Sequence, residues 1–371
     1  MRGQSGSHLR FLGRLDRYVV AHFIGSYGTA LFLVVGLYLV LDMANNAGQY
    51  LRSGDEGTAA SGGDLLHYYL MQIPFLFLQV APFVTLLAGL FTVNRLLKKN
   101  EVTAVLASGV SARRMLMPIF VIGCMLSLGM FMLRETLVET LADQRDRLSW
   151  KLSEGDQPRV YSDVVVHDLL GSLVFLEQFW PGDEEGSAPF AEGVVAIVAE
   201  ADDYVRIDAK RATWNGTDWD LQNGQRQILG DMAATEDVST LLGFDLHPEL
   251  ALTYRRARAE PLELSFAEVE RLVRREPDDT AFRTLWHYHL TFPLANLILL
   301  LVGLPMLFNY ERGGGSERLV VGGILCIFYF AMDFVFRNLG INGGLSPLLA
   351  AWAPVLAFGS LGLVLFEGMR S

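Results

Sequence analysis

Cysteine and charged residues are both scarce in this chain of 371 residues. Its two cysteines, Cys124 and Cys326, lie inside long apolar runs, so the polar middle of the chain has neither a disulfide nor a cysteine-based metal site. Charged residues make up 19% of the sequence, whereas soluble domains have about a quarter. This deficit indicates that long stretches of the chain are apolar.

The sequence motifs of common enzymes are missing as well. The chain has no Walker A phosphate loop, no His-Glu-x-x-His zinc motif and no Gly-x-Ser-x-Gly nucleophile elbow. His287 and His289 are two residues apart, and positions i and i+2 do not share a helix face. We therefore predict that the chain is not an enzyme and binds no metal and no cofactor.

Six apolar segments are long enough to cross a membrane, which takes about 20 residues of helix. They cover residues 19–41, 69–93, 115–133, 288–308, 319–336 and 347–366. The first segment follows a basic start but is longer than the apolar region of a cleaved signal peptide, so we interpret it as a retained span.

Lysine and arginine are unevenly distributed between these spans. The N-terminal tail and the loop between the second and third spans are basic, whereas loop 42–67 is acidic and residues 140–285 carry 29 acidic against 15 basic residues. Because cytoplasmic loops are enriched in Lys and Arg, we expect both termini in the cytoplasm and the central domain outside it. An acidic domain also argues against a nucleic-acid partner.

Residues 160–260 differ in character from the apolar runs. Short segments rich in β-branched and aromatic residues alternate with turn formers, at 160–166, 173–179, 194–199, 205–214 and 219–228. Asn215-Gly216 predicts a tight hairpin turn, and Asn223-Gly224 is a second turn signal. The pattern predicts an antiparallel sandwich or jelly roll. A helix then begins at Ser265, which forms a capping box with Glu268.

These features divide the chain into three parts. We expect an N-terminal transmembrane half at 1–137, an all-β periplasmic domain of jelly-roll type with flanking helices at 138–284, and a C-terminal transmembrane half at 285–371. The predicted fold class is a helical membrane protein with three spans on each side of an inserted β domain.

The basic loop between the second and third spans is the most informative segment. It reads NRLLKKNEVTAVLASGVSARRMLMP over residues 94–118. Val102, Val105 and Leu106 have the spacing of one apolar face of a short helix at about 98–109. Gly109 would end that helix, because it tolerates the left-handed geometry of a C-cap.

Two uses of this short helix remain open. It could lie in the lipid interface as a passive connector, or it could dock in a groove of a cytoplasmic partner and transmit motion. Glu101, the one acid of a basic loop, would suit an arginine on such a partner.

Asp333 lies within the fifth span, where an ionisable group is costly and is therefore a functional candidate. Arg337 follows four residues later and could pair with it on the same helix face. A purely structural ion pair is the alternative interpretation.

Several short motifs, in order along the chain, resemble the LptF/LptG permease family, also called the YjgP/YjgQ family. Members are the membrane subunits of the ABC transporter that extracts lipopolysaccharide from the inner membrane. The resemblance covers nearly the whole chain: Leu15-Asp16-Arg17-Tyr18 before the first span, Pro74 and Pro82 in the second, Glu101, Ala104, Gly109 and Arg113 in the cytoplasmic loop, Ala212, Trp214, Trp219, Leu221 and Asn223-Gly224 in the β domain, and segments 264–268 and 289–305.

The resemblance implies a place in the bacterial inner membrane and several partners. These are a second LptF/LptG-type permease subunit, a separate LptB-like ATPase dimer, and periplasmic LptC/LptA-like jelly-roll proteins that receive the lipid. Contact with the ATPase would involve the coupling residues Glu101, Val102, Val105, Leu106, Gly109 and Arg113. The first and fifth spans would form a lateral gate, with Asp42, Arg52, Asp333 and Arg337 at the gate or in the substrate cavity.

The outer end of the first span departs from the family. Members often carry basic residues there that meet lipid phosphates, whereas this chain has no Lys or Arg between Leu41 and Arg52. Either a partner subunit supplies the charge or the lipid is less anionic. Two other functions were weighed: a non-transporting membrane anchor that presents a β binding domain, and a membrane-embedded hydrolase, for which the spans lack a convergent nucleophile and base.

Overall fold

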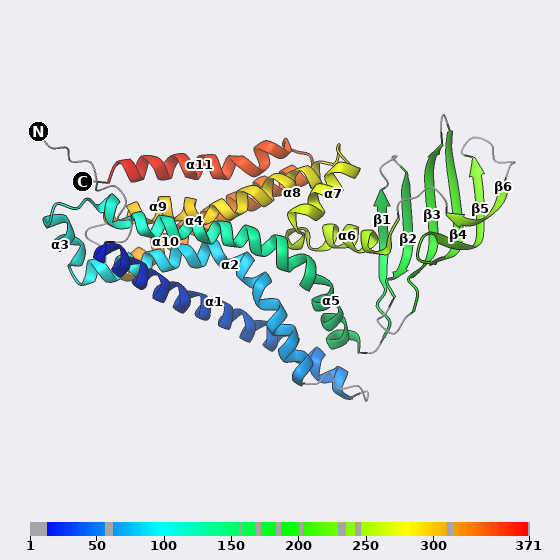
Figure 1. The fold of residues 1–371 in the computed structure, drawn as a ribbon, viewed down its shortest axis with the longest axis horizontal. Coiled ribbons are helices and arrows are strands. Elements are labelled where there is room, and N and C mark those ends of the chain that lie inside the picture. Colours follow the sequence, from blue (N-terminus) through cyan, green and yellow to red (C-terminus); the bar gives the residue numbers. More distant parts are fainter. Residues whose placement is uncertain are drawn as a thin grey trace, which may run out of the picture. The chain divides into compact units, whose positions relative to one another are not determined.

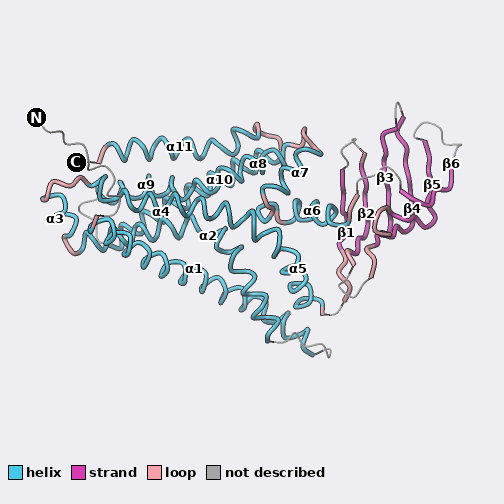
Figure 2. The backbone as a smooth tube through the Cα atoms, viewed as in Figure 1, coloured by secondary structure: helices cyan, strands magenta, loops and turns pink. Residues whose placement is uncertain are grey.

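The computed structural model of the chain describes residues 13–55, 62–155, 157–167, 172–182, 187–200, 203–228, 235–241, 246–309 and 315–369. It divides into two compact units. The helical unit consists of Met1–Asn45, Gln72–Leu133 and His287–Ser371, and the sheet unit consists of Asn46–Met71 and Arg134–Trp286. Figure 2 shows that the strands all belong to the sheet unit, whereas helices occur in both.

Six helical segments among the described residues are long and apolar enough to cross a membrane, as the sequence predicts. They are α1 (Arg14–Asp55), α2 (Gly62–Lys98), α4 (Ala112–Leu133), the pair α8 (Thr280–Thr291) and α9 (Ala295–Asn309), α10 (Gly315–Ile341) and α11 (Pro347–Glu367). Loop 42–67 is shorter than expected, because α1 continues to Asp55 and α2 begins at Gly62. No proline interrupts the chain from 42 to 55, so every residue there keeps the backbone N–H that helix continuation needs. Residues 56–61 lie outside the described ones.

A buried polar cluster holds the bend between α8 and α9. The turn η3 (Phe292–Leu294) contains Pro293, whose carbonyl accepts hydrogen bonds from the Ser127 hydroxyl at 2.7 Å and the Asn296 amide at 2.9 Å. The Thr85 hydroxyl donates to the side-chain oxygen of Asn296 at 2.8 Å. Polar side chains therefore join α2, α4 and α9, which is the usual role of such residues between membrane helices.

The sheet unit contains one six-stranded antiparallel sheet with strand order β1-β2-β3-β4-β5-β6 (Figure 1). The strands are β1 (Tyr161–His167), β2 (Leu173–Trp180), β3 (Phe190–Glu200), β4 (Asp203–Trp214), β5 (Trp219–Ile228) and β6 (Thr235–Leu241). The inserted β domain is thus confirmed. Its described strands form a meander rather than the two-sheet jelly roll that the sequence suggests, because each strand pairs with the next along the chain through a short connection.

Five of the six strands correspond to the segments expected from the sequence, and β6 does not. Its sequence, TEDVSTL, is too polar to stand out as a half-buried strand. The hairpin at Asn215-Gly216 is present, with Trp214 paired to Trp219. Its loop has four residues, and only Gly216 has a positive φ, of 105°. The Asn215 side chain instead accepts hydrogen bonds from the backbone N–H groups of Thr217 and Asp218.

Asn223-Gly224 was expected to be a turn, and this expectation is wrong. Both residues lie inside β5, where the pairing with β6 shifts register between Asp220 and Gly224 and Asn223 has a φ of 54°. The two residues therefore form an irregularity within a strand, a position at which Asn and Gly tolerate the unusual backbone angles.

Replacement of Gly224 by alanine is expected to destabilise the sheet unit. A β-carbon at this position would overlap the backbone carbonyl of Val238 on β6 and would lie 3.1 Å from the side chain of Leu221. Overpacking of this kind costs about 1–3 kcal/mol. The measurement is thermal unfolding of the full chain in detergent. Gly36→Ala is the control, because a β-carbon there meets nothing within 4 Å, and an equal melting temperature for both variants would contradict the prediction.

Three helices share a core with the sheet: α6 (Pro248–Ala259), α7 (Phe266–Arg275) and the first half of α8 contribute side chains to the same buried cluster as the strands. Trp219 is fully buried in this core, and its indole N–H donates to the carbonyl of Leu246 at 2.6 Å. The capping box at the start of α7 is confirmed, with Ser265 and Glu268 bonded reciprocally. Helix α6 was not predicted from the sequence.

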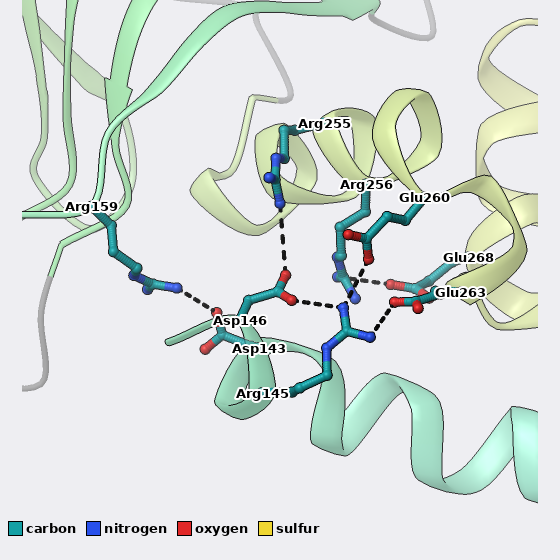
Figure 3. Close-up of polar contacts among 9 residues, drawn as sticks. All are labelled: Asp143, Arg145, Asp146, Arg159, Arg255, Arg256, Glu260, Glu263 and Glu268. Atoms are coloured by element: carbon teal, nitrogen blue, oxygen red, sulfur yellow. Dashed lines mark hydrogen bonds and ion pairs between the residues drawn. The ribbon is translucent and has the colours of Figure 1, made fainter. Parts of the chain in front are cut away.

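An ion-pair cluster around Arg145 ties α5 (Glu139–Glu154) to the segment from α6 to α7 (Figure 3). The Arg145 guanidinium is 2.8 Å from Asp146, 2.8 Å from Glu260 and 2.5 Å from Glu263 of the short turn η2 (Pro261–Glu263), and its side chain is 6% exposed. Arg255 of α6 approaches Asp146 from the other side at 3.8 Å. Three carboxylates thus converge on one buried cation.

The cluster predicts a pH-dependent stability. Burial, followed by the hydrogen bond between Glu260 and Glu263, raises the pKa of Glu263 from 4.5 to about 8. A carboxyl group whose pKa is raised by folding stabilises the fold at low pH, and this contribution is lost as the pH rises from about 4.5 to about 8. We expect the melting temperature of the wild-type chain to fall over this pH range by more than that of Glu263→Gln, whose amide does not ionise. If the melting temperatures of the wild-type chain and Glu263→Gln changed equally with pH, the prediction would be wrong.

Candidate functional site

The short helix expected in the basic loop is present as α3 (Glu101–Ala107), between α2 and α4. It lies at the same end of the helical unit as the start of α1 and the end of α11 (Figure 1). Gly109 has a φ of 83°, its N–H donates to the carbonyl of Leu106, and the N–H of Val110 donates to the carbonyl of Val105. This bonding pattern is a Schellman motif, so Gly109 ends the helix as expected.

The expected apolar face of α3 is divided between the core and the surface. Val102 is buried at 3% exposure in the core of the helical unit, and Val105 is half-buried against the same core. Leu106 is 39% exposed. The outer face also consists of small exposed residues, namely Thr103, Ala104 and Ala107. Val102 and Val105 therefore fix α3 to the bundle, while Leu106 and its small neighbours remain accessible.

Glu101, the first residue of α3, contacts Tyr18 in the second turn of α1. The Tyr18 hydroxyl lies 2.9 and 2.8 Å from the two carboxylate oxygens of Glu101. Sequence reasoning did not assign Tyr18 to this site, because the residues are 83 positions apart and no spacing rule relates them. The signal available was Tyr18's place in the Leu-Asp-Arg-Tyr segment before the first span.

A second link joins α1 to the start of α4. The guanidinium of Arg114 donates two hydrogen bonds to the carboxylate of Asp16, at 2.7 and 2.8 Å. Asp16 is 2% exposed and also accepts a hydrogen bond from the backbone N–H of Gly13. A bidentate Arg–carboxylate pair of this kind is among the strongest and most directional side-chain contacts.

Arg113, which was expected to belong to the ATPase-coupling set, bonds to the end of α11. Its guanidinium donates to the backbone carbonyls of Glu367 and Met369. The last carbonyls of a helix have no partner within the helix, and a cation there also interacts favourably with the helix dipole. Arg113 therefore joins the start of α4 to the end of the last helix.

Of the four residues expected at a lateral gate, Asp333 and Arg337 contact each other in the structure. On α10, Asp333 is 8% exposed and lies 3.5 Å from Arg337, and the Arg337 guanidinium stands 4.6 Å from the ring centre of Tyr288 on α8. The pairing anticipated from the sequence is thus present. Asp42 is partly exposed on α1, and the side chain of Arg52 lies outside what the structure describes.

No group of three or more His, Cys, Asp or Glu residues with metal-ligand geometry is found in the described part of the chain. The polar contacts around α3 connect α1, α3, α4 and α11 by hydrogen bonds and an ion pair, and they leave a face of small residues on α3 exposed.

The family model for the lipopolysaccharide export system permease LptF/LptG matches residues 17–367. The match therefore includes nearly all of the six candidate spans, the sheet and the contact between Tyr18 and Glu101, whereas Asp16 and Met369 lie just outside it. No curated protein matches the chain.

Proposed function

The chain belongs to the LptF/LptG family of lipopolysaccharide export permeases, and from this we propose that it is a permease subunit of an ABC-type exporter. In this function it extracts lipopolysaccharide or a related glycolipid from the inner membrane and passes it to a periplasmic bridge. The chain itself hydrolyses no ATP, and an LptB-like ATPase dimer in the cytoplasm supplies the work.

The main support for this proposal is the way in which the side chains of α3 are divided between the core and the surface. Buried Val102 and half-buried Val105 hold the helix to the bundle, and its outer face presents Leu106, small residues and the Glu101 carboxylate. A passive connector in the lipid interface would direct its apolar face outward to the lipid. Here the apolar residues mostly face the protein, which favours docking into a partner's groove with Glu101 paired to a cation.

The proposed topology follows from the positions of Lys and Arg in the loops and from the six candidate spans. Both termini and α3 lie in the cytoplasm, and the sheet unit lies in the periplasm, because the basic loops face inward. We propose parts at 1–137, 138–284 and 285–371 for the N-terminal transmembrane half, the periplasmic domain and the C-terminal transmembrane half. LptC/LptA-like proteins would continue the β structure away from the membrane.

The exposed surfaces of α1 and α10 fit a lateral gate shared with a second LptF/LptG-type subunit. Within its apolar stretch, only 6% of the α1 residues are buried, against 67% for α2. Large side chains such as Phe32 on α1 and Ile327 on α10 are 77% and 71% exposed. Such surfaces need lipid or a second subunit to cover them. Asp42 and Arg52 on α1, and the pair Asp333 and Arg337 on α10, are the polar groups that we assign to this gate.

Purification of the intact protein from native membranes in mild detergent tests the proposal. We expect an ABC-type ATPase to co-purify, with a phosphorylated or related glycolipid identified by mass spectrometry of the bound lipid. Recovery of the protein without any ATPase, from low to high salt, would refute the permease function and favour a membrane anchor that presents a β domain.

A further inference from the structure

The loop that carries α3 is tied to α1 at both of its ends. At the first residue of α3, Glu101 accepts a hydrogen bond from the Tyr18 hydroxyl, and after the loop Arg114 binds Asp16 with two hydrogen bonds. Tyr18 and Asp16 both lie in the first two turns of α1. A displacement of the loop therefore pulls on the end of α1 through two separate contacts.

Few other contacts in the helical unit hold α1 in place. Its fully buried apolar residues are Val19 and Phe23 in the helical core and Ala30, and many of its other apolar side chains are exposed. By contrast, 72% of the residues in the apolar stretch of α8 and α9 are buried. A helix with little buried surface can shift at lower cost than one packed on all sides, because it loses fewer contacts. The links to α3 and α4 are thus a large part of what determines the position of α1.

The Tyr18 side chain is itself held in a defined orientation. His22, one turn later on α1, lies with its ring centre 4.2 Å from that of Tyr18, and its Nδ1 is 2.9 Å from the Tyr18 carbonyl. The hydroxyl is placed between both oxygens of Glu101. A carboxylate offers about four lone-pair sites, so Glu101 can bind Tyr18 and a cation from a partner at the same time.

We infer that Tyr18 is a positioning residue that transmits movement of α3 to α1. This inference rests on the proposed function, because it assumes that an ATPase moves α3, and it adds the route by which that movement reaches the first span. Glu101 connects the two: its carboxylate binds a cation of the partner and also accepts the hydrogen bond from Tyr18. Tyr18 does not contact the ATPase or the lipid; it acts through Glu101.

The test is Tyr18→Phe, which removes only the hydroxyl, in the complete complex with ATPase and partner subunit reconstituted in lipid vesicles. We expect the ATPase to be captured and ATP to be hydrolysed within about twofold of wild type. The amount of lipid released per ATP is expected to fall about tenfold, as for the loss of one hydrogen bond to a charged group. Tyr204→Phe is the matched control, because Tyr204 is an exposed tyrosine on β4, 60% exposed.

The possible results separate the alternatives. An unchanged ratio of lipid to ATP in Tyr18→Phe would overturn the inference and leave the proposed function intact. Loss of ATPase capture in Tyr18→Phe would also overturn it, since Tyr18 would then belong to the docking surface. If the wild-type protein captures no ATPase, the proposed function fails and the inference fails with it, which is visible before any variant is made.

Discussion

Glu101→Lys is expected to abolish capture of the ATPase and, with it, lipid export. The substitution replaces the one acid of a basic loop by a cation, so an arginine on the partner would meet a like charge instead of a carboxylate. Disruption of a close charge pair in an interface costs about 2–5 kcal/mol, which corresponds to at least about a thirtyfold loss of affinity. Co-purification of the ATPase with a tagged permease, at several salt concentrations, measures the effect.

Two further variants make this result specific to the position. Glu101→Gln keeps an acceptor for the Tyr18 hydroxyl but removes the charge, so we expect it to weaken capture less than lysine does. Glu236→Lys on β6 makes the same charge reversal at an exposed acid, whose side chain is 71% exposed, and should leave capture unchanged. If Glu101→Lys retained both the ATPase and export, the docking role of α3 would be wrong and the anchor hypothesis would gain support.

Arg145→Met is expected to have the largest effect on stability. The substitution removes the buried cation at the centre of three carboxylates, Asp146, Glu260 and Glu263. Breaking a buried ion pair by removal of one partner costs about 3–5 kcal/mol, because the remaining charges are left without compensation. Denaturant or thermal unfolding of the full chain in detergent, followed by a signal from the sheet unit such as Trp fluorescence, measures the loss.

Arg147→Met is the matched control for this prediction. Arg147 is on the same helix and pairs with Asp143 at 2.8 Å, but its side chain is 36% exposed, so its removal should cost less than about 1 kcal/mol. The loss in Arg145→Met should also shrink at lower pH, where protonation of Glu260 removes charge that the substitution leaves uncompensated. Glu263, whose pKa is raised to about 8, is already largely protonated at neutral pH. Equal losses for the two variants would contradict a special role for Arg145.

The fold could be predicted in outline because its strongest signals are local. Six apolar runs and a stretch of alternating strands are visible in the sequence without any knowledge of distant contacts. The parts that sequence reasoning missed or misread depend on other parts of the fold. The polar strand β6 is recognisable only through its pairing with β5, and Asn223-Gly224 forms a bulge rather than a turn because β6 lies beside it.

The candidate site was predicted only in part for the same reason. The existence of α3, its end at Gly109 and the pairing of Asp333 with Arg337 all follow from short sequence spacings. The contacts of Tyr18 with Glu101 and of Asp16 with Arg114 join residues 83 and 98 positions apart, and no spacing rule in a single sequence pairs residues at such separations. Arg113 was predicted to contact the partner, which stays a prediction; its hydrogen bonds to the last carbonyls of α11 are a further contact that the sequence did not indicate.

Labelling of single cysteines from each side of the membrane tests whether α3 and the sheet unit lie on opposite sides of it. In a chain with Cys124 and Cys326 replaced by serine, one cysteine is placed at the exposed position 99 beside α3 and another at the exposed position 204 on β4. We predict that an impermeant reagent outside intact spheroplasts labels Tyr204→Cys but not Lys99→Cys, and that Lys99→Cys is labelled in inverted inner-membrane vesicles. Labelling of both positions from the same side, or of Tyr204→Cys only from the cytoplasm, would contradict it.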